Sequence, residues 1–243
     1  MTNFVFDVDG TLTPSRGKMD EGFKNFFLKF IADHSVYLVT GSDYSKTVEQ
    51  VGVEICESVE SVFNCAGNSI WKNGEQISCN DWSIPKEARD WMNKKLSESK
   101  FSLRTGNHIE ERPGLVNFSI VGRGCTPEQR IIYFEYDIKT DERAILAKEF
   151  NDTFKEMTAQ VAGETGLDII PTGKDKRQIA DMIEGPITFF GDKMKHGGND
   201  FPLMVAIEDR PQSGAVEVKD WKHTQKYLQQ ISLFSLQEAV GMV

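Results

Sequence analysis

Short apolar runs alternate along the first part of the chain with stretches in which apolar residues recur every three or four positions. The run at 4–6 predicts a buried β-strand. Apolar side chains at helical spacing follow over 21–32, and a second apolar run occupies 36–39. A further helix is expected over 44–51. This order of strand, helix, strand and helix is typical of a parallel sheet with crossover helices.

The alternation is less regular in the middle of the chain. Asn73-Gly74 lies between apolar pairs and predicts a β-hairpin. Beyond the hairpin the pattern predicts helices at 82–99 and 143–157, and strands at 116–121 and 166–170. Helices and strands in this order indicate an α+β segment.

After Gly173 the alternation of strand and helix returns. The elements expected there are a short helix, a buried strand, a weak strand and a closing helix, at 178–183, 187–190, 215–218 and 223–231. We therefore predict an α/β fold, in which a Rossmann-like parallel-sheet core carries an inserted α+β cap. The core would comprise residues 1–81 and 174–243, and the cap residues 82–173.

Composition narrows the class of protein. The 243 residues carry a formal net charge of -9 at pH 7, which argues against non-specific nucleic-acid binding because that needs a basic surface. A local group of arginines can still bind a small anion. No stretch approaches the roughly 18 apolar residues of a membrane span, and the start lacks a basic region followed by a long apolar run. We expect neither a membrane segment nor a signal peptide.

The cysteines form no CxxC pair and no zinc-finger spacing; they are Cys56, Cys65, Cys79 and Cys125. Scattered cysteines of this kind indicate reduced thiols in a cytoplasmic protein.

Two carboxylates follow the first predicted strand, in Asp7-Val8-Asp9-Gly10. Ligands of open α/β sheets bind at the carboxyl ends of the strands. Asp7 can attack phosphorus to form an aspartyl phosphate, and Asp9 can protonate the leaving oxygen and later deprotonate the acceptor. Both carboxylates, with a backbone carbonyl of the loop, are candidate ligands of Mg²⁺. Alone, Asp-x-Asp-Gly would be a turn; its place directly after an apolar strand favours phosphoryl transfer.

A phosphoaspartate site also needs a hydroxyl, a cation and further carboxylates. Either Thr40 or Ser42 can supply the hydroxyl, and the sequence does not choose between them. Lys176 can supply the cation. Asp192 and Asp200 can complete the metal site. Singly these residues would be a helix cap, a solvated lysine and exposed carboxylates, but their order along the chain favours a shared site.

Together these motifs resemble the haloacid dehalogenase-like phosphotransferase superfamily, and more closely its eukaryotic-type phosphomannomutase family. The closer resemblance rests on residues 7–16 (DVDGTLTPSR), Gly41-Ser42-Asp43, Asn117-Phe118-Ser119 before Gly122-Arg123, and Phe189-Phe190-Gly191-Asp192 before Gly198-Asn199-Asp200. It extends from about residue 4 to residue 231, and the last dozen residues have no counterpart.

The resemblance implies interconversion of mannose 6-phosphate and mannose 1-phosphate. The reaction would pass through a phosphorylated aspartate and a hexose 1,6-bisphosphate, which is also the implied activator. Asp7 is implied as the nucleophile, Asp9 as the general acid and base, and Asp192 as a ligand of magnesium. A homodimer joined through the caps is implied as well.

The resemblance further implies that arginines grip the second phosphate of the substrate. These are Arg16 in the core and Arg112, Arg123 and Arg130 in the cap. A planar guanidinium binds phosphate through two parallel hydrogen bonds, which a lysine cannot do. Asp168 matches a family residue that contacts sugar hydroxyls. The sequence departs from the family at Gly166, where a serine is usual, and at Lys174, where a tryptophan is usual.

Two other functions compete with the mutase. A magnesium-dependent sugar-phosphate phosphatase would use the same aspartate with water as the acceptor. A non-catalytic sugar-phosphate-binding protein is less favoured, because both Asp7 and Asp9 are present. The cap arginines favour the mutase, since a closing cap can exclude water and hold either phosphate.

Overall fold

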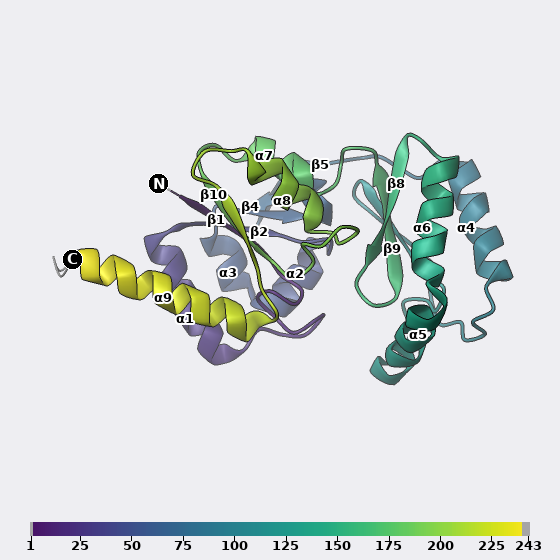
Figure 1. The fold of residues 1–243 in the computed structure, drawn as a ribbon, viewed down its shortest axis with the longest axis horizontal. Helices are drawn as coiled ribbons and strands as arrows, with labels where there is room; N and C mark the ends of the chain where they lie inside the picture. The colour runs from purple at the N-terminus through teal and green to yellow at the C-terminus, as the bar shows by residue number, and fades with distance from the viewer. Residues whose placement is uncertain (1, 240–243) are drawn as a thin grey trace.

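Two β-sheets, one of seven strands and one of four, form the framework of residues 2–239, the part of the chain that the computed structural model describes (Figure 1). The larger sheet has the strand order β11-β10-β1-β2-β3-β4-β5. Its strands are β1 (Asn3–Asp7), β2 (Ser35–Val39), β3 (Ser61–Asn64), β4 (Ser69–Lys72), β5 (Glu75–Cys79), β10 (Ile187–Gly191) and β11 (Gly214–Glu217). The strands from β11 to β3 are parallel, and β4 and β5 add an antiparallel hairpin at one edge.

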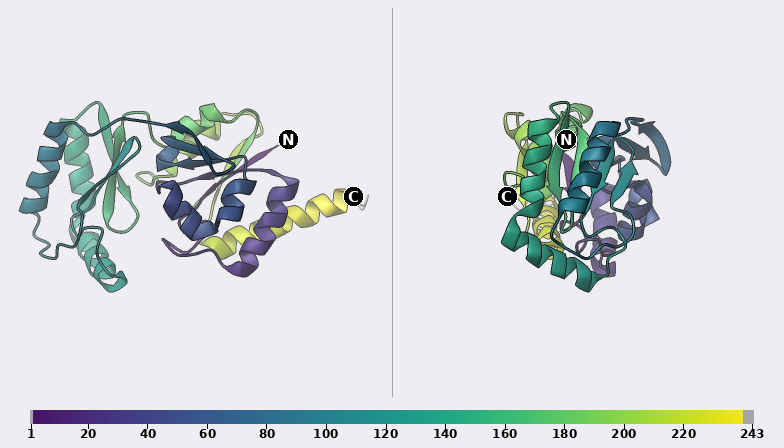
Figure 2. Two further views of the ribbon diagram at one scale, coloured as in Figure 1. Left: turned by 180° about the vertical axis from the view of Figure 1, so that it is seen from behind. Right: turned by 90° about the vertical axis from the view of Figure 1, so that its right-hand side faces the viewer.

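Helices cover both faces of the larger sheet (Figures 1 and 2). On one face lie α1 (Glu21–Asp33), α2 (Tyr44–Val51), α3 (Val53–Ser58) and α9 (Trp221–Ala239); on the other lie α7 (Ile179–Met182) and α8 (Phe201–Glu208). Successive side chains of a strand point to opposite faces. Phe4 and Phe6 of β1 accordingly pack against α1, and Val5 packs against α7 and α8. Burial on both faces explains why the parallel strands read as continuous apolar runs.

The smaller sheet has the strand order β6-β7-β9-β8 and is antiparallel throughout. Its strands are β6 (Ile109–Arg112), β7 (Leu115–Phe118), β8 (Met157–Ala162) and β9 (Gly166–Pro171), and its helices are α4 (Lys86–Glu98), α5 (Pro127–Thr140) and α6 (Glu142–Thr153). Apolar side chains from one face of the sheet and from these helices form a core of their own. The other face of the sheet turns toward the larger sheet (Figure 1).

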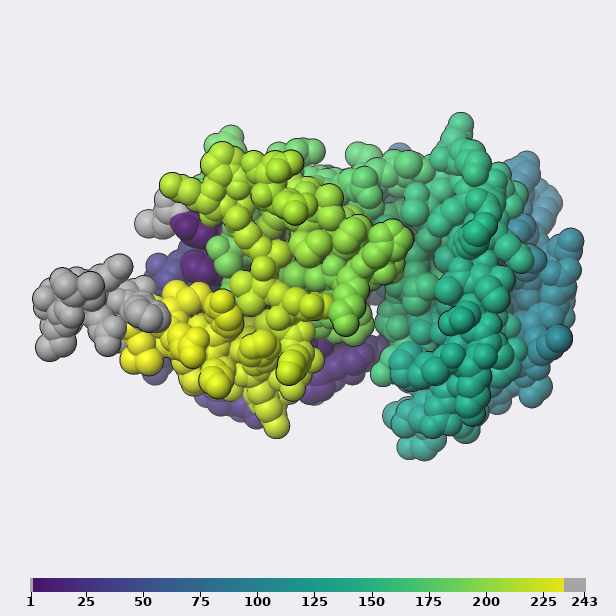
Figure 3. All heavy atoms as spheres, viewed as in Figure 1, coloured from purple at the N-terminus to yellow at the C-terminus, as the bar shows by residue number. Residues whose placement is uncertain are grey.

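Contacts between the loops and strands of the two sheets join them. Cys65, which follows β3, packs with Leu115 of β7 and Ile170 of β9. Arg112 Nη1 donates a hydrogen bond of 2.9 Å to the carbonyl oxygen of Gly41, in the loop after β2. The space-filling view shows the surface hollowed between the purple N-terminal segment and the teal part that carries α5 (Figure 3).

The α/β class with a parallel-sheet core is confirmed, and several element boundaries need correction. The helix predicted over 82–99 begins only at Lys86, because Pro85 restrains the backbone before it. The helix predicted over 143–157 ends at Thr153, and β8 takes the next residues from Met157. Five elements were not predicted: α3, β6, α5, β8 and α8.

Two other expectations can be checked. Cys56, Cys65, Cys79 and Cys125 all lie in the described part of the chain and form no disulfide. Among the described residues, no helix combines the length and the apolar character needed to cross a membrane.

Candidate active site

The candidate site lies where the central strands of the larger sheet end. Asp7 is the last residue of β1, Thr40 follows β2, and Asp192 follows β10. Because β1 is hydrogen-bonded in parallel to both neighbours, these three strand ends meet at one edge of the sheet. The fold thus brings together residues that are up to 185 positions apart in the sequence, as the predicted topology requires.

Three carboxylates converge at this edge. Within residues 2–239, Asp7, Asp192 and Asp200 each offer a ligand atom, and these atoms lie within 4.8 Å of one another. Such oxygen donors suit Mg²⁺. A Cβ on Gly10, whose φ is +84°, would lie 2.5 Å from Asp192 Oδ2, so only glycine leaves this space open. The residues therefore fit a hard divalent cation.

Lys176 is buried among these carboxylates. Its Nζ donates hydrogen bonds of 2.5 Å to Asp7 Oδ1 and 2.6 Å to Asp200 Oδ1. Burial lowers the pKa of Lys176, but the attraction of Asp200 and Asp7 outweighs it, so the pKa lies above its ordinary value and the ammonium stays charged.

The electrostatics of Asp7 favour a bound cation. Burial raises its pKa well above the ordinary value; Lys176 opposes the shift, whereas Asp200 and Asp192 add to it. Three carboxylates thus face the buried ammonium of Lys176 and the more exposed ammonium of Lys193, which lies 2.6 Å from Asp192 Oδ2. The remaining negative charge would be relieved by a metal ion.

The Asp9 side chain has different surroundings. Its Oδ1 accepts hydrogen bonds from the backbone N–H of Arg16 at 2.6 Å and from Gln50 Nε2 at 2.9 Å. The Asp9 carboxylate does not belong to the group formed by the other three. The structure therefore gives no support for Asp9 as a carboxylate ligand of the metal, and its acid–base role stays a prediction.

Thr40 and Ser42 both line the pocket above Asp7. Thr40 is buried, and its Oγ1 accepts a hydrogen bond of 3.1 Å from the backbone N–H of Ser42. This bond leaves the Thr40 hydroxyl hydrogen available to a phosphoryl oxygen, and the Ser42 hydroxyl faces the same pocket. The choice between the two residues stays open.

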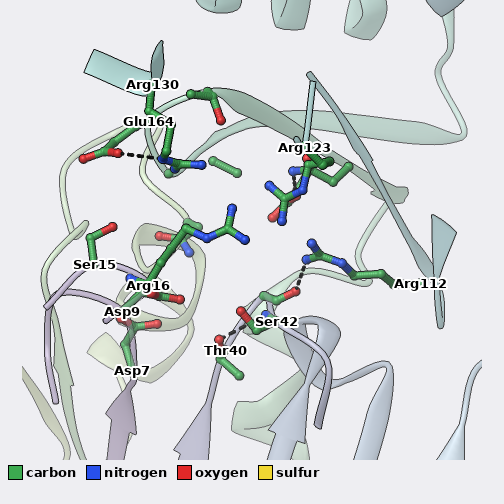
Figure 4. Close-up of a pocket in the computed structure, with 17 residues that line it drawn as sticks. Asp7, Asp9, Ser15, Arg16, Thr40, Ser42, Arg112, Arg123, Arg130 and Glu164 are labelled. Atoms are coloured by element: carbon green, nitrogen blue, oxygen red, sulfur yellow. Dashed lines mark hydrogen bonds and ion pairs between the residues drawn. The ribbon is translucent and has the colours of Figure 1, made fainter. Parts of the chain in front are cut away.

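All four predicted arginines line this same pocket, which lies between the two sheets. Figure 4 shows that these arginines point toward one space above Asp7 and Asp9. They are Arg16, from the side of the larger sheet, and Arg112, Arg123 and Arg130, from the side of the smaller sheet. Burial and then the charges of Arg16 and Arg112 lower the pKa of Arg123 to about 10. The guanidinium is charged at neutral pH. Because it is desolvated and lies beside Arg16 and Arg112, a bound anion would stabilise it.

Acidic side chains hold these arginines. Glu110 Oε2 accepts a hydrogen bond of 2.6 Å from Arg112 Nη2 and lies 2.8 Å from Arg123 Nε. Glu164 Oε2 lies 3.3 Å from Arg130 Nε. Sequence reasoning missed both glutamates. The signal for Glu110 was its spacing of two from Arg112, which places both side chains on one face of a strand.

One arginine donor in the pocket has no partner. Arg112 Nε is buried and makes no hydrogen bond within the described residues. A buried donor without a partner is costly. Arg112 lines the pocket, so a hydrogen-bond acceptor on a bound ligand would satisfy this donor.

Asp168 lies on the β9 strand at the pocket wall. Its Oδ1 accepts a hydrogen bond of 2.7 Å from Asn117 Nδ2. Burial raises the pKa of Asp168, and Arg112 opposes the shift. A Cβ on Gly41 would lie 3.2 Å from Asp168 Oδ2, so this oxygen approaches the loop after β2 across the pocket.

A parallel sheet with an aspartate at the end of its central strand, a buried lysine, converging carboxylates and an arginine-lined cover defines a haloacid dehalogenase-like phosphotransferase. The model of the family described as eukaryotic phosphomannomutase matches residues 23–234. The chain belongs to the eukaryotic phosphomannomutase family.

Similar proteins agree with this assignment. The chain is 34% identical to a phosphomannomutase of Encephalitozoon cuniculi over 214 residues, which cover 83% of this chain and 84% of the relative. It is also 34% identical to phosphomannomutase 1 of Mus musculus over 213 residues, covering 82% and 81% of the two chains. Among solved structures, an N-terminally truncated IMP-nucleotidase of Plasmodium falciparum shares the fold, with a TM-score of 0.64 at 16% identity, over 96% of this chain and 68% of that chain.

Proposed function

We propose that this protein is a phosphomannomutase, which interconverts mannose 6-phosphate and mannose 1-phosphate. The observation that carries the proposal is the arginine-lined pocket directly above Asp7, in a chain of the phosphomannomutase family. One phosphate of the substrate would react at Asp7, and the other would be held by the arginines. A pocket with two phosphate sites can accept the sugar in either orientation, as a mutase requires.

In this mechanism Asp7 carries the transferred phosphoryl group. Phosphorylated Asp7 gives its phosphoryl group to a hydroxyl of the hexose monophosphate, which produces a hexose 1,6-bisphosphate. The bisphosphate then turns round, and Asp7 takes the other phosphoryl group. A hexose 1,6-bisphosphate added as activator would phosphorylate Asp7 initially.

Asp9 would move the proton. It deprotonates the accepting hydroxyl in one half of the reaction and protonates the leaving oxygen in the other. The hydrogen bonds from Arg16 N–H and Gln50 to Oδ1 fix the orientation of the carboxylate and leave Oδ2 for the substrate.

Asp7, Asp192 and Asp200 would hold Mg²⁺, which supplies charge neutralisation for the phosphoryl oxygens when bound. Lys176 holds the Asp7 and Asp200 carboxylates in place through its two hydrogen bonds. Either Thr40 or Ser42 would donate a hydrogen bond to the transferred phosphoryl group.

We also propose the division into a core, residues 1–81 and 174–243, and a cap, residues 82–173. The separate apolar core of the smaller sheet and its helices supports this division. The contacts through Arg112 and around Cys65 are where the cap meets the core.

A homodimer joined through the caps is a further proposal. Several large apolar side chains of α5 and α6 are exposed: Ile131, Ile132, Phe134, Ile138 and Ile145. Exposed large apolar side chains on neighbouring helices favour an interface, and a second copy of the cap would cover them.

The test measures both products of mannose 1-phosphate in the presence of a trace of hexose 1,6-bisphosphate. We expect mannose 6-phosphate to form much faster than inorganic phosphate. Inorganic phosphate without mannose 6-phosphate would instead identify a phosphatase. Asp7→Asn is the matched control: it keeps the shape of the side chain, removes the attacking charge and should abolish both products. An Asp7→Asn variant that retains most of its activity would refute the mechanism.

A further inference from the structure

A row of polar side chains crosses the smaller sheet on the face that lines the pocket. Strand pairing places Glu110, Asn117, Asp168 and Gln160 directly opposite one another, one from each strand. Directly paired residues lie on the same face of a sheet. The residues on either side of Asn117 and Asp168 belong to the apolar core on the opposite face. The row therefore marks the side of the cap that faces the substrate.

Asn117 has an acceptor that the protein does not use. The residue is only 4% exposed. Its Nδ2 donates to Asp168 Oδ1 at 2.7 Å, which fixes the orientation of the amide because a carboxylate oxygen needs a donor. The Oδ1 atom is buried and has no hydrogen-bond partner within the described residues. Asn117 lines the pocket, so a donor on the bound substrate can satisfy this oxygen.

Gly166 provides the space that the Asn117 side chain occupies. A Cβ on Gly166 would lie 2.7 Å from Asn117 Nδ2 and 3.0 Å from Asn117 Oδ1. The amide cannot easily move away, because it is buried and bonded to Asp168. The space is the reason for this glycine, since Gly166 is not among the residues with positive φ.

We propose that Asn117 is the positioning residue for Asp168 and that its Oδ1 accepts a hydrogen bond from a hydroxyl of the hexose ring. Gly166 is the residue that permits this arrangement. The acceptors of Asn117 and Asp168 lie side by side and suit two hydroxyls of one sugar ring. The inference rests on the proposed mutase function and deepens it, because it assigns residues that bind the sugar rather than its phosphates.

The experiment compares two activities in Asn117→Ala and Gly166→Ala. One is mutase turnover of mannose 1-phosphate, and the other is hydrolysis of an aryl phosphate, which has no sugar ring. For both variants we expect kcat/KM of the mutase reaction to fall roughly 10-fold or more beyond any loss in aryl phosphate hydrolysis, mainly through KM, because a hydrogen bond to a charged group is lost. Lys148→Ala is the control, since Lys148 lies on the cap helix α6, where it forms only an exposed ion pair with Asp152.

A double-mutant cycle separates this role from a general loss of structure. Once Asn117 is alanine, the space beside residue 166 is empty, so Gly166→Ala should cause little further loss in the double variant. Additive losses, or equal losses in both activities, would overturn the inference. Thermal unfolding checks each fold, and Gly166→Ala tests the inference even if Asn117→Ala does not fold. A wild-type protein that makes no mannose 6-phosphate would refute the proposed function itself.

Discussion

Single residues in this site act through their charge environment. Asp7 would be a weakly ionised carboxylate if burial alone acted on it, because burial raises its pKa. Lys176, 2.5 Å away, counteracts this effect. The pKa of Lys176 is raised because carboxylates surround it, and the pKa of Asp7 stays raised in spite of Lys176. A bound cation would therefore complete the charge balance of the site.

This charge balance makes a prediction about metal removal. A chelator should abolish turnover, and an excess of Mg²⁺ should restore it. Mg²⁺ should also raise the midpoint of thermal unfolding, because an ion that binds only the folded state stabilises it. The shift is measured without substrate, so it reports binding independently of activity.

Asp192→Asn provides the matched comparison, since it removes one of the three carboxylates. The thermal shift produced by Mg²⁺ should shrink in this variant. An unchanged shift would mean that the ion binds elsewhere on the protein.

At the scale of elements, the missed helix α5 is instructive. Its outward apolar residues, among them Ile131 and Ile138, obscure the spacing that marks an amphipathic helix. Within the single chain these side chains are exposed, whereas a second copy packed against them would bury them. Local sequence patterns assume a single chain, so they fail where an interface adds its own apolar positions.

The proposed interface predicts the effect of a charge. Ile138→Glu should convert the dimer to a monomer in light scattering, because a buried carboxylate without a partner is costly. Ile77→Glu is the control, since Ile77 is also exposed but lies on β5, far along the chain from the cap helix α5. Dissociation by both substitutions, or by neither, would contradict an interface at α5.

At the scale of the whole molecule, catalysis depends on a pocket that neither sheet forms alone. The larger sheet provides Asp7, Asp9 and Arg16, and the smaller one provides Arg112 and Arg123. In the proposed mechanism the reacting group thus lies on one layer, and the arginines for the distal phosphate, apart from Arg16, lie on the other. A movement of the cap relative to the core would open the pocket for exchange of substrate and product.

The division of roles predicts a selective loss of mutase activity. Arg123→Ala and Arg130→Ala should each lower mutase turnover roughly 10- to 150-fold, which corresponds to a charge-assisted hydrogen bond of about 1.5–3 kcal/mol. Hydrolysis of a small aryl phosphate should fall less, because that substrate has no second phosphate. Arg89→Ala removes a surface ion pair with Glu111 of the same cap and serves as the control. Equal losses in both assays would argue against a distal phosphate site.

Some expectations stay predictions of the sequence. These are the cytoplasmic location and the absence of nucleic-acid partners. They rest on the net charge and on the scattered cysteines.

The sequence by itself determined the parts of the protein that depend on local patterns. Apolar runs located the central strands because both faces of a parallel sheet are buried, and Asp7 and Asp9 were evident because two carboxylates directly after such a strand lie at its ligand-binding end. The arginines were identified by their resemblance to those of the phosphomannomutase family.

Only the tertiary structure showed that Glu110 holds Arg112 and Arg123, that Asp9 lies outside the carboxylate group, and that Gly166 makes room for Asn117. Those relations depend on the register of paired strands and on distances of a few ångströms between remote segments, which local patterns do not encode.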